Sequence, residues 1–275
     1  MDIKITEFQP KDGEYERDGV WYCGVCNHPV SKIMDTPYIR GVVRATCQCR
    51  QNEADKAHQQ SLEIKRKRAF EKRKFMRFGF TFANDDRRNP TVSDILKTYC
   101  DDFETNKKTG HGFLLHSVQN GGGKTFLACA VANELVDRGY NVLVTDFLTL
   151  RDKLFNPQSF REGNRVFVNK VDFLQSLLSY DLVVIDDLGV EQSTEFMLEV
   201  EYRIIEYLTD GLVPLILTTN YTLSELRSDE NREKRRVFDR IFGSCALLSI
   251  NQPNGKSRRV ERCAEITRKL TAQNA

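Results

Sequence analysis

Short apolar runs alternate with longer amphipathic stretches along the chain after residue 79. Four runs have the length of buried strands, and they lie at 113–115, 141–146, 182–185 and 213–220. The stretches between them repeat apolar residues at three- and four-residue steps, which predicts helices at 91–105, 124–139, 147–155, 171–180 and 195–209. Strands that alternate with helices predict the α/β fold class, with a parallel sheet flanked by helices and ligands at the C-terminal edge of its strands.

The first 78 residues follow a different pattern. Residues 1–20 are polar without periodicity, and we interpret them as a loosely ordered segment. No proline or glycine interrupts residues 51–77, which predicts a long helix. We therefore predict a cysteine-rich module at 1–50, a helical linker at 51–78 and a nucleotide-binding domain at 79–275.

The linker carries a concentrated positive charge. Eight Lys or Arg and two Glu give residues 61–80 a local net charge of +6. We interpret this run as a solvated linker helix, because it shows no base-reading pattern. The alternative is a basic contact surface for a partner protein or a nucleic-acid backbone.

Composition narrows the class of protein. The 275 residues are 29% charged and 40% hydrophobic, which is ordinary for a globular protein, and the net charge of +2 provides no global field for nucleic acid. The apolar runs are too short to span a bilayer, and residues 1–10 lack the apolar core of a secretory signal. We expect a cytoplasmic protein with no membrane partner.

A glycine cluster joins the predicted strand at 113–115 to the helix that follows, in the sequence GFLLHSVQNGGGKTFLACA. The three glycines at 121–123 can adopt backbone angles closed to other residues, so successive N–H groups can turn toward a polyphosphate. Lys124 supplies a cation for the β- and γ-phosphates, and Thr125 supplies an oxygen for Mg²⁺ at the helix N-terminus. The sequence therefore predicts a phosphate-binding loop.

Two features flank this loop. Val118 stands where the pattern G-x-x-x-x-G-K-[ST] has its first glycine, so we expect an altered loop start with retained phosphate binding. Upstream, the segment FGFTFAND at 78–85 is typical of an entry strand or turn of a nucleotide-binding domain. Phe80 and Phe82 can pack there against an adenine ring, although core packing explains them equally well.

Paired carboxylates follow the apolar run at 182–185. Asp186 is placed to hold a Mg²⁺ ion and Asp187 to polarise an attacking water. Such a pair can also form an ordinary turn or cap, but its position 62 residues after Lys124 favours catalysis. The next predicted strand ends at Asn220, which can orient the water or simply form a turn.

Four of the eight cysteines cluster near the N-terminus as C-x₂-C, twenty residues, then C-x-C. Two thiolates at each end of a short loop can complete a tetrahedral shell, so we predict a structural zinc site. Its ligands would be Cys23, Cys26, Cys47 and Cys49. Because C-x-C is unusually tight, His28 is an alternative ligand. We interpret the remaining cysteines as buried thiols, namely Cys100, Cys129, Cys245 and Cys263.

Taken together, these elements resemble the DnaC/DnaI-type replicative helicase loaders, which are ATPases of the AAA+ superfamily. The resemblance covers most of the chain and rests on NGGGKT, LVVIDDLG, LILTTN, RRVFDRI and the terminal SRR, with a cysteine-rich module like that of the DnaI branch. It implies that Lys124 and Thr125 are the Walker A residues and that Asp186 and Asp187 are the Walker B pair. The nucleotide contacts that it implies are Asn120, Gly121, Gly122, Gly123, Lys124, Thr125, Phe126 and Arg259.

The same resemblance assigns residues that sense the nucleotide. It implies Asn220 as sensor 1, Arg240 as an arginine finger that reaches a neighbouring subunit, and Arg259 as sensor 2. Arg236 competes with Arg240, and Arg258 competes with Arg259, because a small shift in alignment exchanges each pair. The chain ends sixteen residues after Arg259, so we expect neither a helical lid domain nor a C-terminal DNA-reading domain.

The resemblance implies an ATP-dependent loader of the hexameric replicative DNA helicase that acts in the initiation of DNA replication. Its N-terminal module would bind the helicase, while its ATPase domains self-associate and engage single-stranded DNA. The expected cofactors are ATP, Mg²⁺ and Zn²⁺. We expect slow hydrolysis that single-stranded DNA stimulates, because Asp-Asp replaces the usual Asp-Glu. The alternatives are an IstB-like transposition ATPase that binds DNA and regulates a transposase, and a zinc-stabilised adaptor that binds ATP only as a structural ligand.

Overall fold

The computed structural model describes residues 4–6, 8–36, 39–70, 79–156, 161–162, 165–166, 169–189, 194–228, 232–251 and 257–272. They form two compact units that divide between Ile64 and Lys65, inside the predicted linker. The smaller unit contains β1 (Lys4–Thr6), β2 (Glu14–Arg17), β3 (Val20–Cys23), β4 (Ser31–Asp35), β5 (Ile39–Arg44) and most of α1 (Gln48–Ala69).

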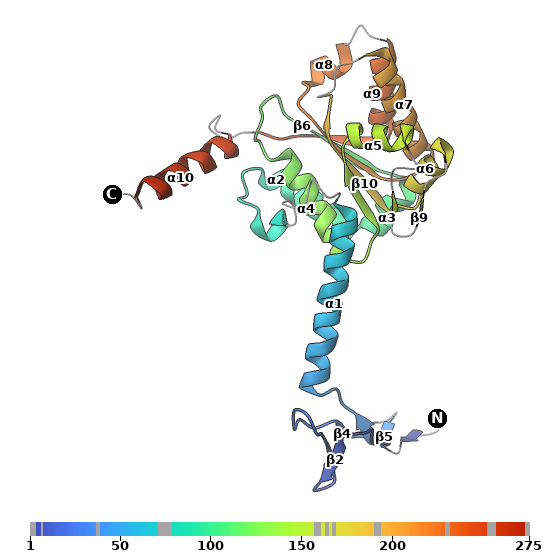
Figure 1. Ribbon diagram of the computed structural model, residues 1–275, viewed down its shortest axis with the longest axis vertical. Coiled ribbons are helices and arrows are strands. Elements are labelled where there is room, and N and C mark those ends of the chain that lie inside the picture. The colour runs from blue at the N-terminus through green and yellow to red at the C-terminus, as the bar shows by residue number, and fades with distance from the viewer. Residues whose placement is uncertain are drawn as a thin grey trace. The chain divides into compact units, whose positions relative to one another are not determined.

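The larger unit is built around a five-stranded sheet (Figure 1). All neighbouring strands are parallel, in the order β12-β6-β11-β10-β7, which confirms the predicted α/β class. Its elements are η2 (Phe82–Asn84), α2 (Pro90–Asp101), α3 (Phe103–Thr109), β6 (Gly112–His116), α4 (Lys124–Asp137), β7 (Val142–Thr145), α5 (Phe147–Phe155), β8 (Arg161–Glu162), β9 (Arg165–Val166), α6 (Lys170–Leu177), β10 (Leu182–Leu188), α7 (Glu195–Asp210), β11 (Leu215–Thr219), α8 (Leu223–Ser228), α9 (Arg232–Ser244), β12 (Cys245–Ser249) and α10 (Arg258–Ala272).

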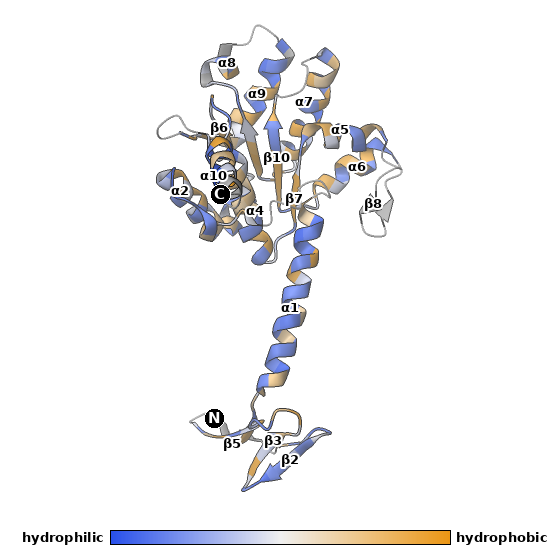
Figure 2. Cartoon of the chain, turned by 60° about the vertical axis from the view of Figure 1, so that its left-hand side comes forward, coloured by the Kyte–Doolittle hydropathy of each residue, from blue (hydrophilic) through white to orange (hydrophobic). Residues whose placement is uncertain are grey.

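Both faces of this sheet are covered by helices, so β6 and β11 are buried along their whole length and are mostly apolar (Figure 2). Successive side chains of a strand point to opposite faces. Leu114 therefore packs into a core with α5, α6, α7 and α9, while Leu115 packs into a second core with α2, α3 and α4. The C-terminal edge of the sheet lies between these two layers of helices, where the phosphate loop begins.

Helix α1 is strongly hydrophilic along its length (Figure 2). At its C-terminal end, Arg66 donates to both carboxylate oxygens of Asp137 on α4, at 2.7 and 2.6 Å. This contact supports the linker interpretation for that part of the basic run. The predicted helix reaches 77, but residues 71–78 lie outside the described part of the chain. None of the described helices has both the length and the apolarity that crossing a membrane requires.

The structure of residues 14–17 differs from the loosely ordered segment that we predicted at 1–20. They form β2, which pairs antiparallel with β3, so this part of the segment is not loosely ordered. The strand is polar and gave no hydrophobic alternation. Glu14 instead bonds Arg44 at 2.7 Å and Arg50 at 3.2 Å, and its hydrogen bond with Arg44 lowers the pKa of the Glu14 carboxyl.

Two further predictions needed correction. The helix expected at 91–105 is broken at Asp102 into α2 and α3. Of the strand or turn expected at 78–85, the described residues form the turn, as the short 3-10 helix η2, and no strand. Cys263 is exposed on α10, whereas the other three scattered cysteines are buried as expected. The strand β12 was not predicted, and it pairs with β6 along the full length of both strands.

Replacement of Phe147 by Ala should lower the free energy of unfolding by about 3–5 kcal/mol, because the ring is 1% exposed in the core beneath α5. The neighbouring change Leu148→Ala is the matched control, since Leu148 is 44% exposed, and it should cost about 1 kcal/mol or less. Urea denaturation followed by circular dichroism measures both. Equal losses in the two variants would contradict the described packing of α5.

Candidate functional site

The loop between β6 and α4 is shaped by glycines. Gly121 has φ of +86° and Gly123 has φ of +108°, a region that strongly favours glycine. Val118 is 68% exposed and is not among the described residues with positive φ, so its place in the loop does not require a glycine. The departure from the consensus pattern therefore leaves the part of the loop next to α4 intact.

Lys124, the first residue of α4, folds back over this loop. Its buried Nζ donates to the carbonyl oxygens of Ser117 at 3.3 Å and Gln119 at 3.4 Å. Burial lowers the pKa of the Lys124 ammonium group, and this effect outweighs the opposing influence of Asp187 and Asp186. An anion at the loop would offer the ammonium a stronger partner than two carbonyl oxygens.

The acidic strand meets the start of α4 through Asp186. Its buried carboxylate accepts hydrogen bonds from the hydroxyl of Thr125 at 2.8 Å and from the hydroxyl of Thr218 at 2.7 Å. A hydroxyl and a carboxylate oxygen are ligands that Mg²⁺ prefers. The pair Thr125 and Asp186 therefore has the chemistry and the proximity to bind Mg²⁺ together with a polyphosphate.

Asp187 and the end of β11 lie next to this pair. The strand β10 continues through both aspartates, with a shifted register between Ile185 and Leu188, and Asp187 has φ of +61°. The Asp187 N–H donates to the Thr218 hydroxyl at 2.8 Å, which links the two strands where they end. Asn220 follows β11 directly and is partly buried, at the edge of the sheet where the sequence placed it.

Residues at the start of α10 contact the loop from another direction. The Arg258 N–H donates to the carbonyl oxygen of Gly121 at 3.3 Å, and a Cβ atom built on Gly123 would lie 1.8 Å from Arg258 Nη1. Arg259 is exposed, and it lowers the pKa of Lys124. Arg258 therefore contacts the loop directly, and which of the two arginines acts as sensor 2 stays a prediction.

The two alternatives for the arginine finger both contact α7 within the same chain. Arg240 binds Asp210 at 2.5 Å and Glu206 at 3.1 Å. The guanidinium of Arg236 stacks over the ring of Tyr202 at 4.2 Å. The role of either arginine toward a neighbouring subunit stays a prediction.

Three aromatic residues lie close to the loop helix. The rings of Phe80 and Phe126 are 5.2 Å apart, and Asn133 of α4 donates to the Phe80 carbonyl oxygen at 2.9 Å. Phe80, Phe82 and Phe126 are partly buried against the core that contains α2 and α4. These contacts support the core-packing alternative for Phe80 and Phe82, and their contact with adenine stays a prediction.

The cysteine cluster in the smaller unit is a candidate metal site. The four Sγ atoms of Cys23, Cys26, Cys47 and Cys49 lie within 4.8 Å of one another. They come from the end of β3, the turn after it, the residue before α1 and the first turn of α1. Separations of 3.5 Å between Cys23 and Cys49 and 3.2 Å between Cys47 and Cys49 are too long for disulfides. The donor set fits a metal ion that prefers sulfur ligands.

Hydrogen bonds shift the pKa values of two thiols in this cluster in opposite directions. A backbone N–H of Cys49 lowers the pKa of Cys26 to about 6, whereas hydrogen bonding to Cys47 raises the pKa of Cys49 to about 12. Four thiolates cannot share so small a space unless a metal compensates their charge. His28 Nδ1 lies 2.9 Å from the Cys26 carbonyl oxygen, and His28 does not belong to the cluster.

Sequence reasoning missed two features of the nucleotide site. His116 ends β6 and is buried, and its Nδ1 has no hydrogen-bond partner among the described residues. Asp86 binds Arg258 and thereby links the segment before α2 to the phosphate loop. Neither residue belongs to a recognisable motif, so only the tertiary structure reveals its position.

Comparison with known proteins identifies relatives of this chain. It is 25% identical over 195 residues to the replicative helicase loader DnaI of Bacillus subtilis (strain 168), an alignment that covers 64% of this chain and 58% of that protein. It is also 25% identical over 163 residues to the replicative helicase loader DnaC of Escherichia coli (strain K12), with 59% of this chain and 62% of that protein covered. The chain thus spans about three-fifths of the length of these curated relatives.

Solved structures support the fold. A crystal structure of DnaI matches with a TM-score of 0.51 and 21% identity over 66% of this chain and 93% of that chain. A crystal structure of a DNA replication initiation factor matches with a TM-score of 0.50 and 19% identity over 71% of this chain and 55% of that chain. These likenesses, together with the strand order, confirm the predicted AAA+ fold.

A family profile described as IstB-like ATP binding protein matches residues 51–264, which is most of the chain. The match includes the phosphate loop, the acidic strand and the first turns of α10. The chain therefore belongs to the family of IstB-like ATP-binding proteins.

Proposed function

We propose that this protein is an ATP-dependent loader of a replicative DNA helicase. The observation that carries the proposal is the similarity to two curated loaders, DnaI and DnaC, in a chain that also belongs to an ATP-binding family. The geometry supports the ATP-dependent part of the proposal. The helix after the phosphate loop, the acidic strand and the end of β11 meet at the buried carboxylate of Asp186.

ATP would bind with its phosphates on the N–H groups of the loop between Gly121 and Thr125. Lys124 would exchange its two carbonyl contacts for phosphate oxygens. The Thr125 hydroxyl and the Asp186 carboxylate would hold Mg²⁺, which neutralises phosphate charge when it is bound. This arrangement retains the direct contact between α4 and β10 that the protein already has.

Hydrolysis would use the residues at the ends of β10 and β11. Asp187 would accept a hydrogen bond from the attacking water, and Asn220 would orient that water. Arg240 of one subunit would stabilise the charge at the site of its neighbour, so self-association and hydrolysis would be coupled. The shorter carboxylate of Asp187 favours slow hydrolysis, which single-stranded DNA would stimulate.

The cysteine cluster would hold a structural Zn²⁺ ion, because four thiolates leave no open position for a substrate. The smaller unit would then be the part that binds the hexameric helicase. The two units would therefore have different roles in loading. The smaller one would bind the helicase, and the larger one would bind ATP and single-stranded DNA.

A second candidate is an ATPase of transposition, which would bind duplex DNA and regulate a transposase. The family match favours it, since the family is defined by IstB-like proteins. The cysteine-rich module and the similarity to two loaders favour helicase loading. We therefore keep helicase loading as the main proposal.

Protein purified without chelator should contain about one zinc ion per chain by mass spectrometry of metals. The double change Cys26→Ser and Cys49→Ser should remove the zinc, because it leaves only two thiolates. The change Cys263→Ser is the matched control, since this cysteine is exposed on α10, and it should leave the zinc content unchanged. Absence of zinc from the unaltered protein would contradict the proposed metal site.

The helicase proposal is tested by size-exclusion chromatography with light scattering on a mixture of the full chain and the replicative helicase of the same organism. We expect a co-eluting complex in the presence of ATP. The double cysteine variant should lose this complex but retain ATP binding, because its change lies in the other unit. The Cys263→Ser variant should behave like the unaltered protein.

If the helicase elutes alone with and without ATP, the loader proposal is wrong. Co-elution with a transposase and binding of duplex DNA would then establish the second candidate. Helicase binding that survives loss of the zinc would instead place the helicase contact on the larger unit.

A further inference from the structure

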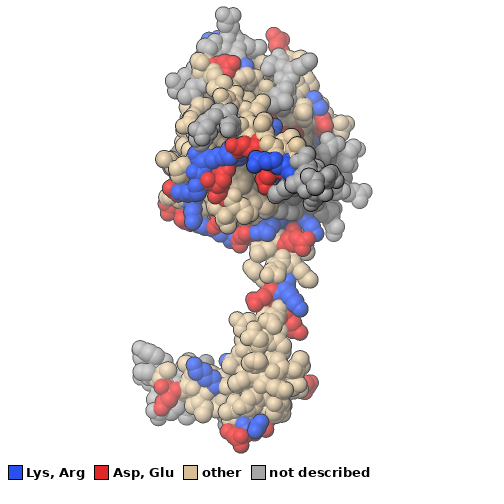
Figure 3. All heavy atoms as spheres, turned by 90° about the vertical axis from the view of Figure 1, so that its left-hand side faces the viewer, with Lys and Arg blue, Asp and Glu red and all other residues tan. Residues whose placement is uncertain are grey.

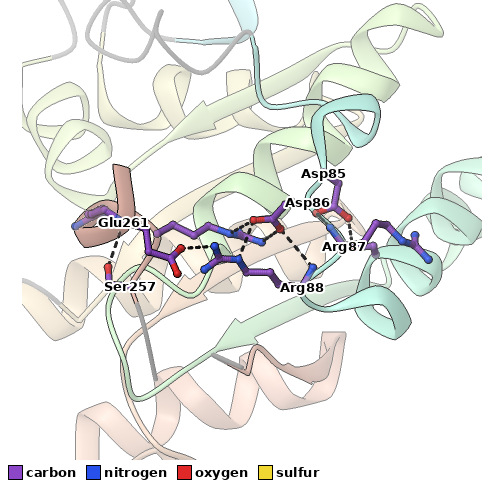
Figure 4. Close-up of polar contacts among 9 residues, drawn as sticks. Asp85, Asp86, Arg87, Arg88, Ser257 and Glu261 are labelled. Atoms are coloured by element: carbon purple, nitrogen blue, oxygen red, sulfur yellow. Dashed lines mark hydrogen bonds and ion pairs between the residues drawn. The ribbon is translucent and has the colours of Figure 1, made fainter. Parts of the chain in front are cut away.

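Four charged residues join the segment before α2 to the start of α10, and we call Asp86, Arg88, Arg258 and Glu261 the charged cluster. Figure 4 labels Asp86, Arg88 and Glu261. Arg258 donates from Nε to Asp86 at 2.9 Å, and its Nη2 binds the second oxygen of the same carboxylate. Arg88 lies 3.0 Å from Asp86 and also binds Glu261 on α10. A chain of alternating charges therefore connects the two segments.

This cluster lies directly against the phosphate loop. Ser257 and Arg258 are packed on the glycines of the loop so closely that a Cβ on Gly121 would lie 2.1 Å from Ser257 Oγ, and one on Gly123 would lie 1.8 Å from Arg258 Nη1. The Arg258 guanidinium also lies over the ring of Phe126, 5.7 Å from its centroid. The position of this guanidinium is therefore fixed by contacts on several sides.

One donor of Arg258 has no acceptor within the described part of the chain. Nη1 is buried and makes no hydrogen bond among the described residues, while Nε and Nη2 are both taken by Asp86. A buried donor without a partner carries a desolvation cost that a ligand oxygen would remove. Because Nη1 lies beside Gly123, the residue before Lys124, the missing acceptor would be in reach of the loop that binds phosphate.

The two arginines of the charged cluster are more enclosed than the nearby pair of Arg87 and Asp94, whereas its carboxylates, Asp86 and Glu261, are 43% and 38% exposed. The side chains of Arg258 and Arg88 are 22% and 28% exposed, whereas the nearby pair of Arg87 and Asp94 is 52% and 62% exposed. Charges that are shielded from water interact more strongly. Burial alone would raise the pKa of Asp86, but Arg258 and Arg88 lower it overall, so the carboxylate is charged at neutral pH. Acidic and basic side chains also lie side by side on the face that Figure 3 shows.

We propose that Asp86 is a positioning residue for nucleotide binding, because it holds two donors of Arg258 so that the third, Nη1, is directed to a phosphate oxygen of ATP on the loop. Arg88 and Glu261 secure this arrangement by anchoring the first turn of α10 to the same carboxylate. The inference rests on ATP binding by the phosphate loop, which the proposed function requires, and it adds a group outside every recognised motif.

The competing explanation is that the cluster only attaches α10 to the rest of the larger unit. In that case, loss of Asp86 would lower stability and would affect ATP binding whether or not Arg258 is present. If Asp86 acts through Arg258, the effects of the two changes on ATP binding are not additive.

The experiment measures the dissociation constant for ATP by isothermal titration calorimetry on the full chain and on five variants of it. We expect Arg258→Ala to weaken binding about tenfold or more, because a charge-assisted hydrogen bond to phosphate is lost. Asp86→Asn, which keeps the shape of the side chain, should weaken binding about threefold to tenfold. The double variant should bind ATP no more weakly than Arg258→Ala alone.

Asp94→Asn is the matched control, because it breaks an exposed pair with Arg87 on the same segment and should leave the dissociation constant unchanged. Glu261→Gln provides a second variant that does not touch Arg258 directly, and it should weaken binding by less than Asp86→Asn does. Thermal melts verify that each variant is folded.

Unchanged ATP affinity in Asp86→Asn, or an equal further loss when Asp86→Asn is added to Arg258→Ala, would overturn the inference while leaving the proposed function intact. Absence of ATP binding by the unaltered chain would overturn both. The wild-type titration therefore separates failure of the proposed function from failure of this inference.

Discussion

The buried carboxylate of Asp186 is the constraint on which the rest of the nucleotide site depends. A charge removed from water is tolerated only where hydrogen bonds compensate it, and here two threonine hydroxyls do so. One hydroxyl belongs to the first turn of α4 and the other to β11, so the carboxylate joins the loop helix to two neighbouring strands. The two groups proposed to bind Mg²⁺, the Thr125 hydroxyl and the Asp186 carboxylate, are thus in direct contact.

The strand order explains why these groups meet. The strand β6 lies between β12 and β11, and β11 lies between β6 and β10, so the phosphate loop and the acidic pair leave the same edge of the sheet. The segment from Asp85 to Arg88 and the start of α10 approach the loop from outside the sheet, held by charge rather than by strand pairing. The loop is therefore held by hydrogen bonds within the sheet and by ionic contacts at its rim.

Sequence reasoning predicted the features that local patterns encode. The continuous apolar runs identified β6, β7, β10 and β11, and the cysteine spacing anticipated a cluster that the fold does bring together. It missed β2, whose polar residues are stabilised by the ion pair of Glu14 with Arg44, and it missed β12, which follows α9 without an intervening turn. It also missed the break at Asp102, where no glycine or proline marks the end of a helix.

In the nucleotide site, too, the sequence predicted what a local motif encodes and missed contacts between distant segments. The sequence motifs were sufficient to place Lys124, Thr125 and Asp186. Each of these residues lies at a fixed position next to the phosphate loop or at the end of a strand. The motif could not separate Arg258 from Arg259, because a shift of one position in the alignment exchanges them. Their side chains point about 100° apart on the helix, so only the structure shows which one contacts the loop. Asp86 carries no motif and became a candidate only when its contact with Arg258 was visible.

The central role of Asp186 is tested most directly by the change Asp186→Asn, with ATP binding and release of phosphate measured on the same preparation. The variant preserves the size of the side chain and an acceptor for the threonine hydroxyls but removes the negative charge that would hold Mg²⁺. We expect that ATP still binds to the loop and that phosphate release falls to background. Phosphate release at the wild-type rate would contradict the claim that this buried carboxylate organises the nucleotide site.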